Sequence, residues 1–338
     1  MQIGGWSRCW LNEQREAEER QHLLSIRDGG AAVQKPSASA LRWWALVVFS
    51  TMSAVQNAIW ISFSVVIDPA CDFFGVGTGS INFLASLGPL VLIPVAFITG
   101  PMSRSMGLRA VVVLGCALTA LGAILRVPAI FVNDHRYSWA VVGHAINAAA
   151  GPVIMSCPPL LSSTWFPLHE RTTATAIAYN AQIFGIAFGW AVEPYIVTQK
   201  SEVPRLIWLE AAFGVVTLLV GLTFPPAPAT APTVSAGEER AGFWSGVSIL
   251  LRRPAFMGLA ALWSISAGVN GGWATLLDVF LKDKQTNVEI GWIGFGGSLA
   301  GAAGGVVAGV LIDRFDQSLK WGMVAVRYCS RLSVAHTP

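Results

Sequence analysis

Charge is what this sequence has least of. Asp, Glu, Lys and Arg make up only 12% of its 338 residues, while 54% are hydrophobic. Soluble globular chains carry about 25% charged residues, so this chain has too little charge to cover a water-facing surface of its own size. The shortage excludes an ordinary soluble protein and indicates a surface that lies largely in lipid. The net charge of +3 is small and dispersed, which argues against a nucleic-acid partner.

Motifs of several other protein classes are missing as well. The five cysteines are scattered and form no C-x-x-C pair, so neither a disulfide framework nor a metal site is predicted. No H-E-x-x-H, G-x-S-x-G or phosphate-binding glycine motif occurs, which argues against a membrane-embedded enzyme and predicts no catalytic residues and no cofactor. The N-terminus also lacks the apolar region of a cleaved signal peptide.

What the sequence does have is a series of long apolar runs. Each is about 18 to 25 residues long, the length with which a helix crosses ~30 Å of hydrocarbon. Helices are required because backbone N–H and C=O groups in lipid must pair within the segment. We therefore expect an all-α membrane protein with spans near 43–67, 81–101, 109–132, 138–163, 173–198, 206–224, 255–280 and 291–312.

Polar stretches divide these spans into parts. We predict a tail at 1–41, a six-helix N-terminal bundle at 42–224, a linker at 225–254, a partial C-terminal bundle at 255–315 and a divergent tail at 316–338. The linker opens with Pro225-Pro226-Ala227-Pro228, which is typical of a connection between domains. Lys and Arg are more frequent in the loops on the side of the first tail and the linker, so both are expected to be cytosolic.

The loops that follow the second and eighth spans are similar to each other. The first reads Gly100-Pro-Met-Ser-Arg104-Ser-Met-Gly107-Leu-Arg109, and the second reads Gly309-Val-Leu-Ile-Asp313-Arg314. Each loop taken alone could supply only cytosolic positive charge. Their repetition at corresponding places favours a gate, because many secondary transporters are built from repeated halves. An acidic residue at a helix end can pair with basic groups and hold the cytosolic face closed.

These loops resemble the signature of the major facilitator superfamily, G-x-x-x-D-R/K-x-G-R/K-R/K. The second copy keeps Asp313 and Arg314, whereas the first keeps Gly107 and Arg109 but has Arg104 in place of the aspartate. The resemblance implies the major facilitator fold, of which this chain supplies about eight of about twelve spans. Residues after 320 no longer resemble the family. We therefore expect an apparently truncated chain that transports poorly, or one that serves as a receptor or binds a partner instead.

A narrower resemblance is to solute carrier family 49. It rests on Arg42-Trp43 through Trp60, Gly151-Pro152, Ser162 to Phe166, and Leu277-Asp278 with 291–295, within a match over about 42–315. The family handles cationic or ring-bearing solutes such as choline and pyridoxine. The resemblance therefore implies a transporter of a small organic solute, a vitamin or an organic cation, that works by alternating access.

Polar residues inside spans are the default functional candidates, because they cost free energy unless they face the interior. The predicted solute-binding residues are Gln56, Asn57, Trp60, Asn147, Gln182, Asn270 and Trp273. The resemblance implies that spans one, four and seven line the cavity, and that Trp60 matches a tryptophan shared by the family. An indole face suits ring stacking or cation–π contact. The alternative is that the amides join helices and that Trp60 is packed or faces lipid.

Proton coupling requires a membrane-embedded group that titrates. The candidates are Glu193, His144 and Asp278. Because all three lie toward the non-cytosolic ends of their spans, the alternative is that each is simply hydrated at the interface.

The tail contains a possible sorting signal. Glu19-Arg-Gln-His-Leu23-Leu24 fits the acidic dileucine pattern D/E-x-x-x-L-L/I, which docks into clathrin adaptors. It is also matched in a lysosomal member of family 49. The pattern predicts a lysosomal or other endomembrane location, against the alternative of an unremarkable tail on a plasma-membrane protein.

Overall fold

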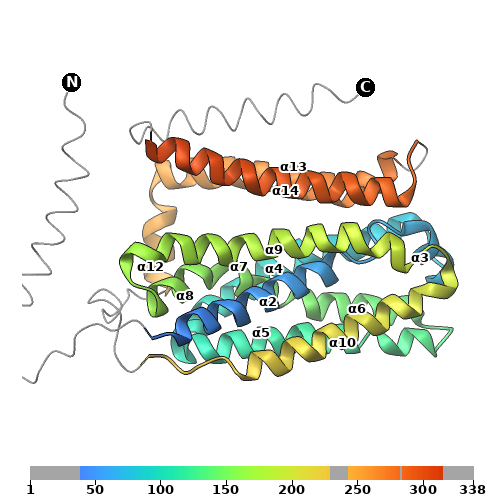
Figure 1. Ribbon diagram of the computed structural model, residues 1–338, viewed down its shortest axis with the longest axis horizontal. Coiled ribbons are helices and arrows are strands. Elements are labelled where there is room, and N and C mark those ends of the chain that lie inside the picture. The colour runs from blue at the N-terminus through green and yellow to red at the C-terminus, as the bar shows by residue number, and fades with distance from the viewer. Residues whose placement is uncertain (1–38, 229–242, 282–283, 315–338) are drawn as a thin grey trace, which may run out of the picture. The chain divides into compact units, whose positions relative to one another are not determined.

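The computed structural model describes residues 39–228, 243–281 and 284–314, and within these ranges it consists of helices and the turns between them. Figure 1 shows the long helices between residues 41 and 222 running alongside one another. This confirms the predicted all-α fold. Six of the described helices are long and apolar enough to cross a membrane.

The helices of the first bundle follow the predicted spans closely. They are α2 (Leu41–Ile61), α3 (Ile67–Phe74), α4 (Thr78–Ser105), α5 (Gly107–Ile124), α6 (Arg136–Ala148), α7 (Gly151–Ser156), α8 (Pro158–Trp165), α9 (Leu168–Ile196) and α10 (Val203–Leu222). The short helices η1 (Val127–Ile130) and η2 (Lys200–Glu202) lie in the connections. Helix α12 (Phe243–Leu251) lies within the predicted linker at 225–254, and α13 (Pro254–Leu281) and α14 (Asn287–Arg314) follow it.

Three predicted spans differ from the observed helices. The third, predicted at 109–132, ends at Ile124, and the short helix η1 follows it. The fourth span is broken into α6, α7 and α8, since Pro152 and Pro158 lack the N–H that a continuous helix would need. The first span ends at Ile61, and the chain then turns through Phe63, whose φ of 68° lies in the left-handed region. A residue with a large side chain rarely adopts that conformation.

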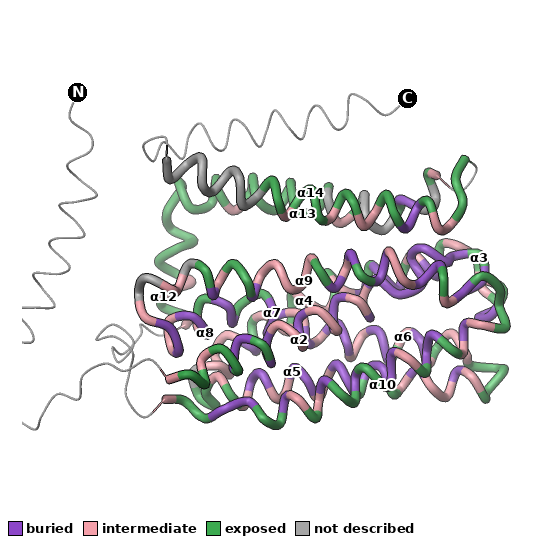
Figure 2. Tube along the Cα trace, viewed as in Figure 1, coloured by how far each residue is buried: buried purple, intermediate pink, exposed green. Residues whose placement is uncertain are grey.

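Glycines allow the inner helices to approach closely. Helix α2 packs along α9, and α5 packs against both α6 and α10. A Cβ atom at Gly185 would collide with the Ala54 backbone, and one at Gly143 would collide with the carbonyl of Gly122. Small residues at such crossings are how membrane helices pack without a hydrophobic driving force. In Figure 2 the buried positions follow the inner faces of these helices.

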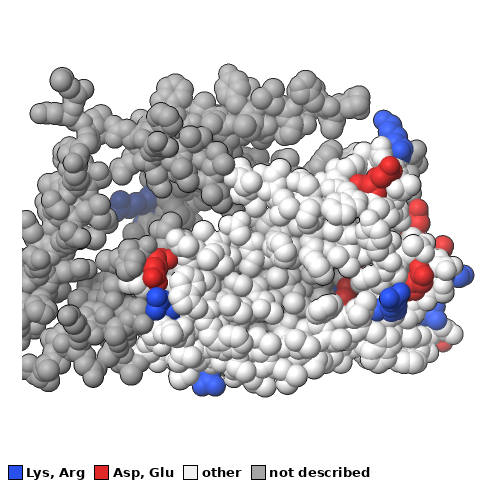
Figure 3. Space-filling view, viewed as in Figure 1, with Lys and Arg blue, Asp and Glu red and all other residues white. Residues whose placement is uncertain are grey.

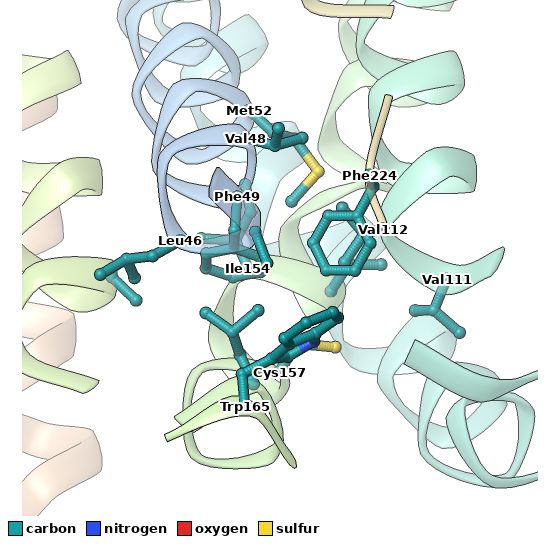
Figure 4. Packing of buried hydrophobic residues seen from close by; sticks show 14 of the residues in the cluster. Leu46, Val48, Phe49, Met52, Val111, Val112, Ile154, Cys157, Trp165 and Phe224 are labelled. Carbon is teal, nitrogen blue, oxygen red and sulfur yellow. The ribbon is translucent and has the colours of Figure 1, made fainter. Parts of the chain in front are cut away.

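One apolar core fills the half of the bundle where α2 begins. Figure 4 shows Phe49 and Met52 of α2 close to Val112 of α5, Ile154 of α7 and the ring of Phe224. Trp165 meets Phe224 edge to face, with ring centroids 6.5 Å apart. This core holds together the end that carries the predicted cytosolic loops.

A second core covers the opposite end. Phe63 and Phe74 pack edge to face at 5.3 Å, and Leu84, Ala140 and Ile207 complete the contact between α4, α6 and α10. The charged side chains visible in Figure 3 gather toward the two ends of the helices. This arrangement is expected of helices whose middle parts lie in hydrocarbon.

Helices α13 and α14 meet the first bundle near this second core. Ile61, Val65 and Trp190 pack with Leu277 of α13 and Ile290 of α14, a group that we call the junction cluster. By contrast, apolar side chains in the first part of α13 are exposed, among them Trp263 at 66%. In a chain that crosses a membrane, such side chains can face lipid.

Candidate functional site at the end of helix α2

Two of the predicted solute-binding amides bind each other's helix. The Gln56 amide donates to the Asn147 backbone carbonyl, and the Asn147 amide donates to the Gln56 carbonyl, each at 3.2 Å. Asn57 donates to Ser53 O within α2 at 2.9 Å. The structure therefore brings the three residues together, and their amides join α2 to α6 or close on α2 itself, as the alternative interpretation expected.

The indole of Trp60 is held in a socket on α4. Its Nε1 donates to Ala85 O at 3.0 Å. That carbonyl has no donor within α4, because the residue four positions on is Pro89, which lacks an N–H. A Cβ at Gly88 would collide with the indole nitrogen. The Gly88-Pro89 pair thus supplies both the room and the free acceptor that orient Trp60.

His144 and Glu193 are buried, which contradicts the alternative that interfacial water hydrates them. His144 is 0% exposed and its Nε2 lies 3.1 Å from Trp60 O. Since a carbonyl can only accept, this nitrogen carries the proton. Glu193 is 4% exposed, and its Oε2 accepts from the Phe63 backbone N–H at 3.2 Å.

A buried ion pair, Arg126 with Glu210, completes this region and was missed from the sequence. Arg126 is 0% exposed, and its Nη1 lies 2.8 Å from Glu210 Oε2. Its Nη2 donates to Ile59 O at 3.2 Å, while the Ser62 hydroxyl bridges Ile59 O and the Glu210 carboxylate. The sequence does contain a signal for this pair. Both charged residues fall inside apolar runs, where an ionisable side chain is a functional candidate by default.

These contacts surround the last turn of α2, and we call them the α2 collar. Arg126 holds the carbonyl of Ile59, His144 holds that of Trp60, and Glu193 holds the N–H of Phe63. The last carbonyls of a helix have no partner within the helix. Side chains from distant parts of the chain satisfy them here and hold the left-handed turn that follows.

A cavity of about 450 Å³ lies against the collar between α2, α9 and α10. Its wall is mainly apolar and includes Ala58, Phe188 and Phe213, with Glu193 and Glu210 on its inner side. The volume falls within the range of small-molecule pockets.

The predicted gate is only partly described. Gly107 has a φ of 78° at the turn between α4 and α5, a conformation suited to glycine, and Arg109 is exposed. At this end Arg42 and Glu170 form an ion pair at 3.0 Å that joins α2 to α9.

Other predicted residues cannot be placed at the site. Gln182 is half-buried on α9. The side chains of Arg104, Asn270, Trp273, Asp278, Asp313 and Arg314 lie outside the described residues, as do Glu19, Leu23 and Leu24 altogether.

The chain matches the family model of the Major Facilitator Superfamily over residues 37–328, and it belongs to that superfamily of transporters. Among curated proteins it is 30% identical to the solute carrier family 49 member 4 homolog of Xenopus laevis, over 89% of this chain and 68% of that one. It is 27% identical to the choline/ethanolamine transporter FLVCR2 of Homo sapiens, over 82% of this chain and 55% of that one. The predicted place in solute carrier family 49 is thereby confirmed, and the chain spans about two thirds of the length of the member 4 homolog.

Solved structures show the same fold. A bacterial homolog of the human lysosomal transporter Spinster, in an inward-facing and unoccupied conformation, matches with a TM-score of 0.60 at 16% identity, over 82% of this chain and 64% of that one. A D-xylose–proton symporter matches with a TM-score of 0.50 at 13% identity, over 81% and 68%. The predicted major facilitator fold is confirmed.

Proposed function

We propose that the protein carries a small organic solute, a vitamin or an organic cation such as pyridoxine or choline, across a lysosomal or other endomembrane by alternating access. One observation carries this proposal. Trp60 is packed against the junction cluster, where α2 and α9 of the first bundle meet α13 and α14. Secondary transporters hold their solute between their repeated halves.

The socket of Trp60 supports the class of solute. Because the indole N–H already donates to Ala85 O, a ligand would contact the ring rather than its N–H. Aromatic faces attract other rings and quaternary ammonium groups, and such contacts contribute about 0.5–2 kcal/mol. A relative that carries the name choline/ethanolamine transporter fits this chemistry.

The test is exchange of labelled choline or pyridoxine in proteoliposomes that contain the 338-residue chain. Trp60→Ala should lower exchange about 2- to 30-fold, the factor that corresponds to the loss of one such contact. Trp208→Ala is the matched control, because Trp208 is 52% exposed on α10. Equal exchange by the two variants would refute the proposal, and no exchange of either solute by the unmodified chain would refute it in favour of the alternative, a truncated chain that does not transport.

The location is proposed from the tail. Leu23→Ala with Leu24→Ala should move a fluorescently tagged chain from endomembranes to the cell surface, since adaptor docking needs both apolar side chains. Unchanged lysosomal fluorescence would show that the tail signal does not act.

A further inference from the structure

The charges of the α2 collar do not balance. The cluster contains one guanidinium, that of Arg126, and two carboxylates, those of Glu193 and Glu210. Glu210 lies 2.8 Å from Arg126, whereas Glu193 accepts a hydrogen bond from the Phe63 backbone. A buried charge without a counter-charge is costly and is normally neutralised. The cluster is one positive charge short.

A metal ion does not fit as the missing positive charge. Alkali and alkaline-earth cations need several oxygen ligands, but the groups around Glu193 include the Phe63 N–H, which is a donor, and the Ile61 side chain against Gly189. No group of three His, Cys, Asp or Glu side chains suited to a metal occurs among the described residues. A proton needs only one carboxylate oxygen.

We propose that Glu193 binds and releases a proton during transport, and that this proton controls the turn after α2. This inference rests on the proposed function and assigns its coupling residue. An ionised carboxylate binds the Phe63 N–H more strongly than a neutral carboxyl does. The ionised form therefore holds Phe63 in its left-handed conformation, and proton uptake allows the turn to relax.

The other charged and titratable groups near Glu193 fit this assignment. Arg126, which follows α5, and Glu210 on α10 lie near it. His144 on α6 contacts the Trp60 carbonyl of the same collar. On α14, the Glu289 carboxylate is exposed and accepts from the Thr286 N–H at 2.8 Å, and the side chain of Asp278 on α13 lies outside the described residues. Glu193 is thus the buried carboxylate whose charge Arg126 leaves unbalanced.

The turn is connected to the contact between the two halves. Ile61 and Val65, which flank Phe63, belong to the junction cluster with Trp190, Leu277 and Ile290. Glu193 follows Trp190 by one helical turn, and the Trp190 ring lies against Gly294 of α14. A change in the turn therefore alters a surface that α13 and α14 contact directly.

The experiment separates solute exchange from proton-driven accumulation in proteoliposomes with choline or pyridoxine. Glu193→Gln keeps a carbonyl acceptor for Phe63, so exchange should stay within about 3-fold of the unmodified chain. Accumulation driven by a pH gradient, and solute-induced acidification reported by a trapped pH dye, should both fall at least about 10-fold. Glu289→Gln, on an exposed carboxylate, should change neither.

A stability measurement gives an independent readout. Because Glu193→Gln removes an unbalanced buried charge, its melting temperature should equal or exceed that of the unmodified chain. Glu210→Gln removes the partner of Arg126 and should lower it. The inference is overturned if Glu193→Gln accumulates solute normally, if it is destabilised as much as Glu210→Gln, or if a sodium gradient replaces the proton gradient. If the unmodified chain exchanges neither solute, the proposed function itself has failed.

Discussion

Arg126 is a fully buried cation that binds a carboxylate, a hydroxyl and a helix-terminal carbonyl. Arg126→Met should lower the free energy of unfolding by about 3–5 kcal/mol, because it leaves Glu210 buried without its counter-charge. Thermal or denaturant unfolding in detergent would measure the loss.

Two further variants test the reason for that loss. In Arg126→Met with Glu210→Met, no unpaired charge remains, so most of the stability should return. Arg109→Met removes an exposed arginine and should leave stability unchanged. If the double variant is as unstable as Arg126→Met alone, the guanidinium acts through Ile59 and Ser62 rather than through the ion pair.

The site could be predicted from the sequence as a set of residues but not as an arrangement. Polar groups in apolar runs pointed to Gln56, Trp60, His144 and Asn147, which the structure does bring together. Distance from the end of a predicted span suggested that Glu193 is hydrated. It is buried because α3 and the turn after α2 pack over that end, with Phe63 and Phe74 in contact. Hydropathy along the chain cannot show that one segment covers the end of another.

At the scale of elements, hydropathy predicts where the helices lie and prolines explain the breaks around α7, whereas the break after α2 depends on contacts distant in sequence. The end of α2 at Ile61 illustrates this. The residues after it are apolar and would continue a helix, but Arg126, Glu193 and Glu210 bind the turn instead. These partners lie more than sixty residues away, so no local pattern could have shown the break.

The contact between α9 and α14 depends on Gly294. A Cβ there would collide with the Trp190 ring, whereas a Cβ at Gly297 would meet nothing within 4 Å. Gly294→Val should therefore separate the helices and expose Ile61. The measurement is labelling of Ile61→Cys by a membrane-impermeant maleimide in a cysteine-free background.

Gly297→Val on the same helix is the control and should leave that labelling low. If both valine variants label equally, the Trp190–Gly294 contact does not close this end of the protein.

For the molecule as a whole, orientation in the membrane is a prediction from charge. Arg109 lies at the start of α5, at the end predicted to be cytosolic, and Lys200 precedes α10 at the opposite end. In the cysteine-free background and at the proposed lysosomal location, an impermeant maleimide added to intact organelles should label Arg109→Cys and spare Lys200→Cys. The reverse pattern would invert the topology, and with it the cytosolic assignment of the tail and the linker.

The socket of Trp60 has a consequence for how this chain can change over generations. Pro89 has no N–H, so the Ala85 carbonyl on α4 is free to accept from the indole of Trp60 on α2 and orient it. If the proline were replaced, the new residue's N–H would bond to the Ala85 carbonyl and the indole would lose its acceptor. If the tryptophan were lost, that carbonyl would have no donor. The two positions should therefore be inherited as a pair, although they belong to different helices.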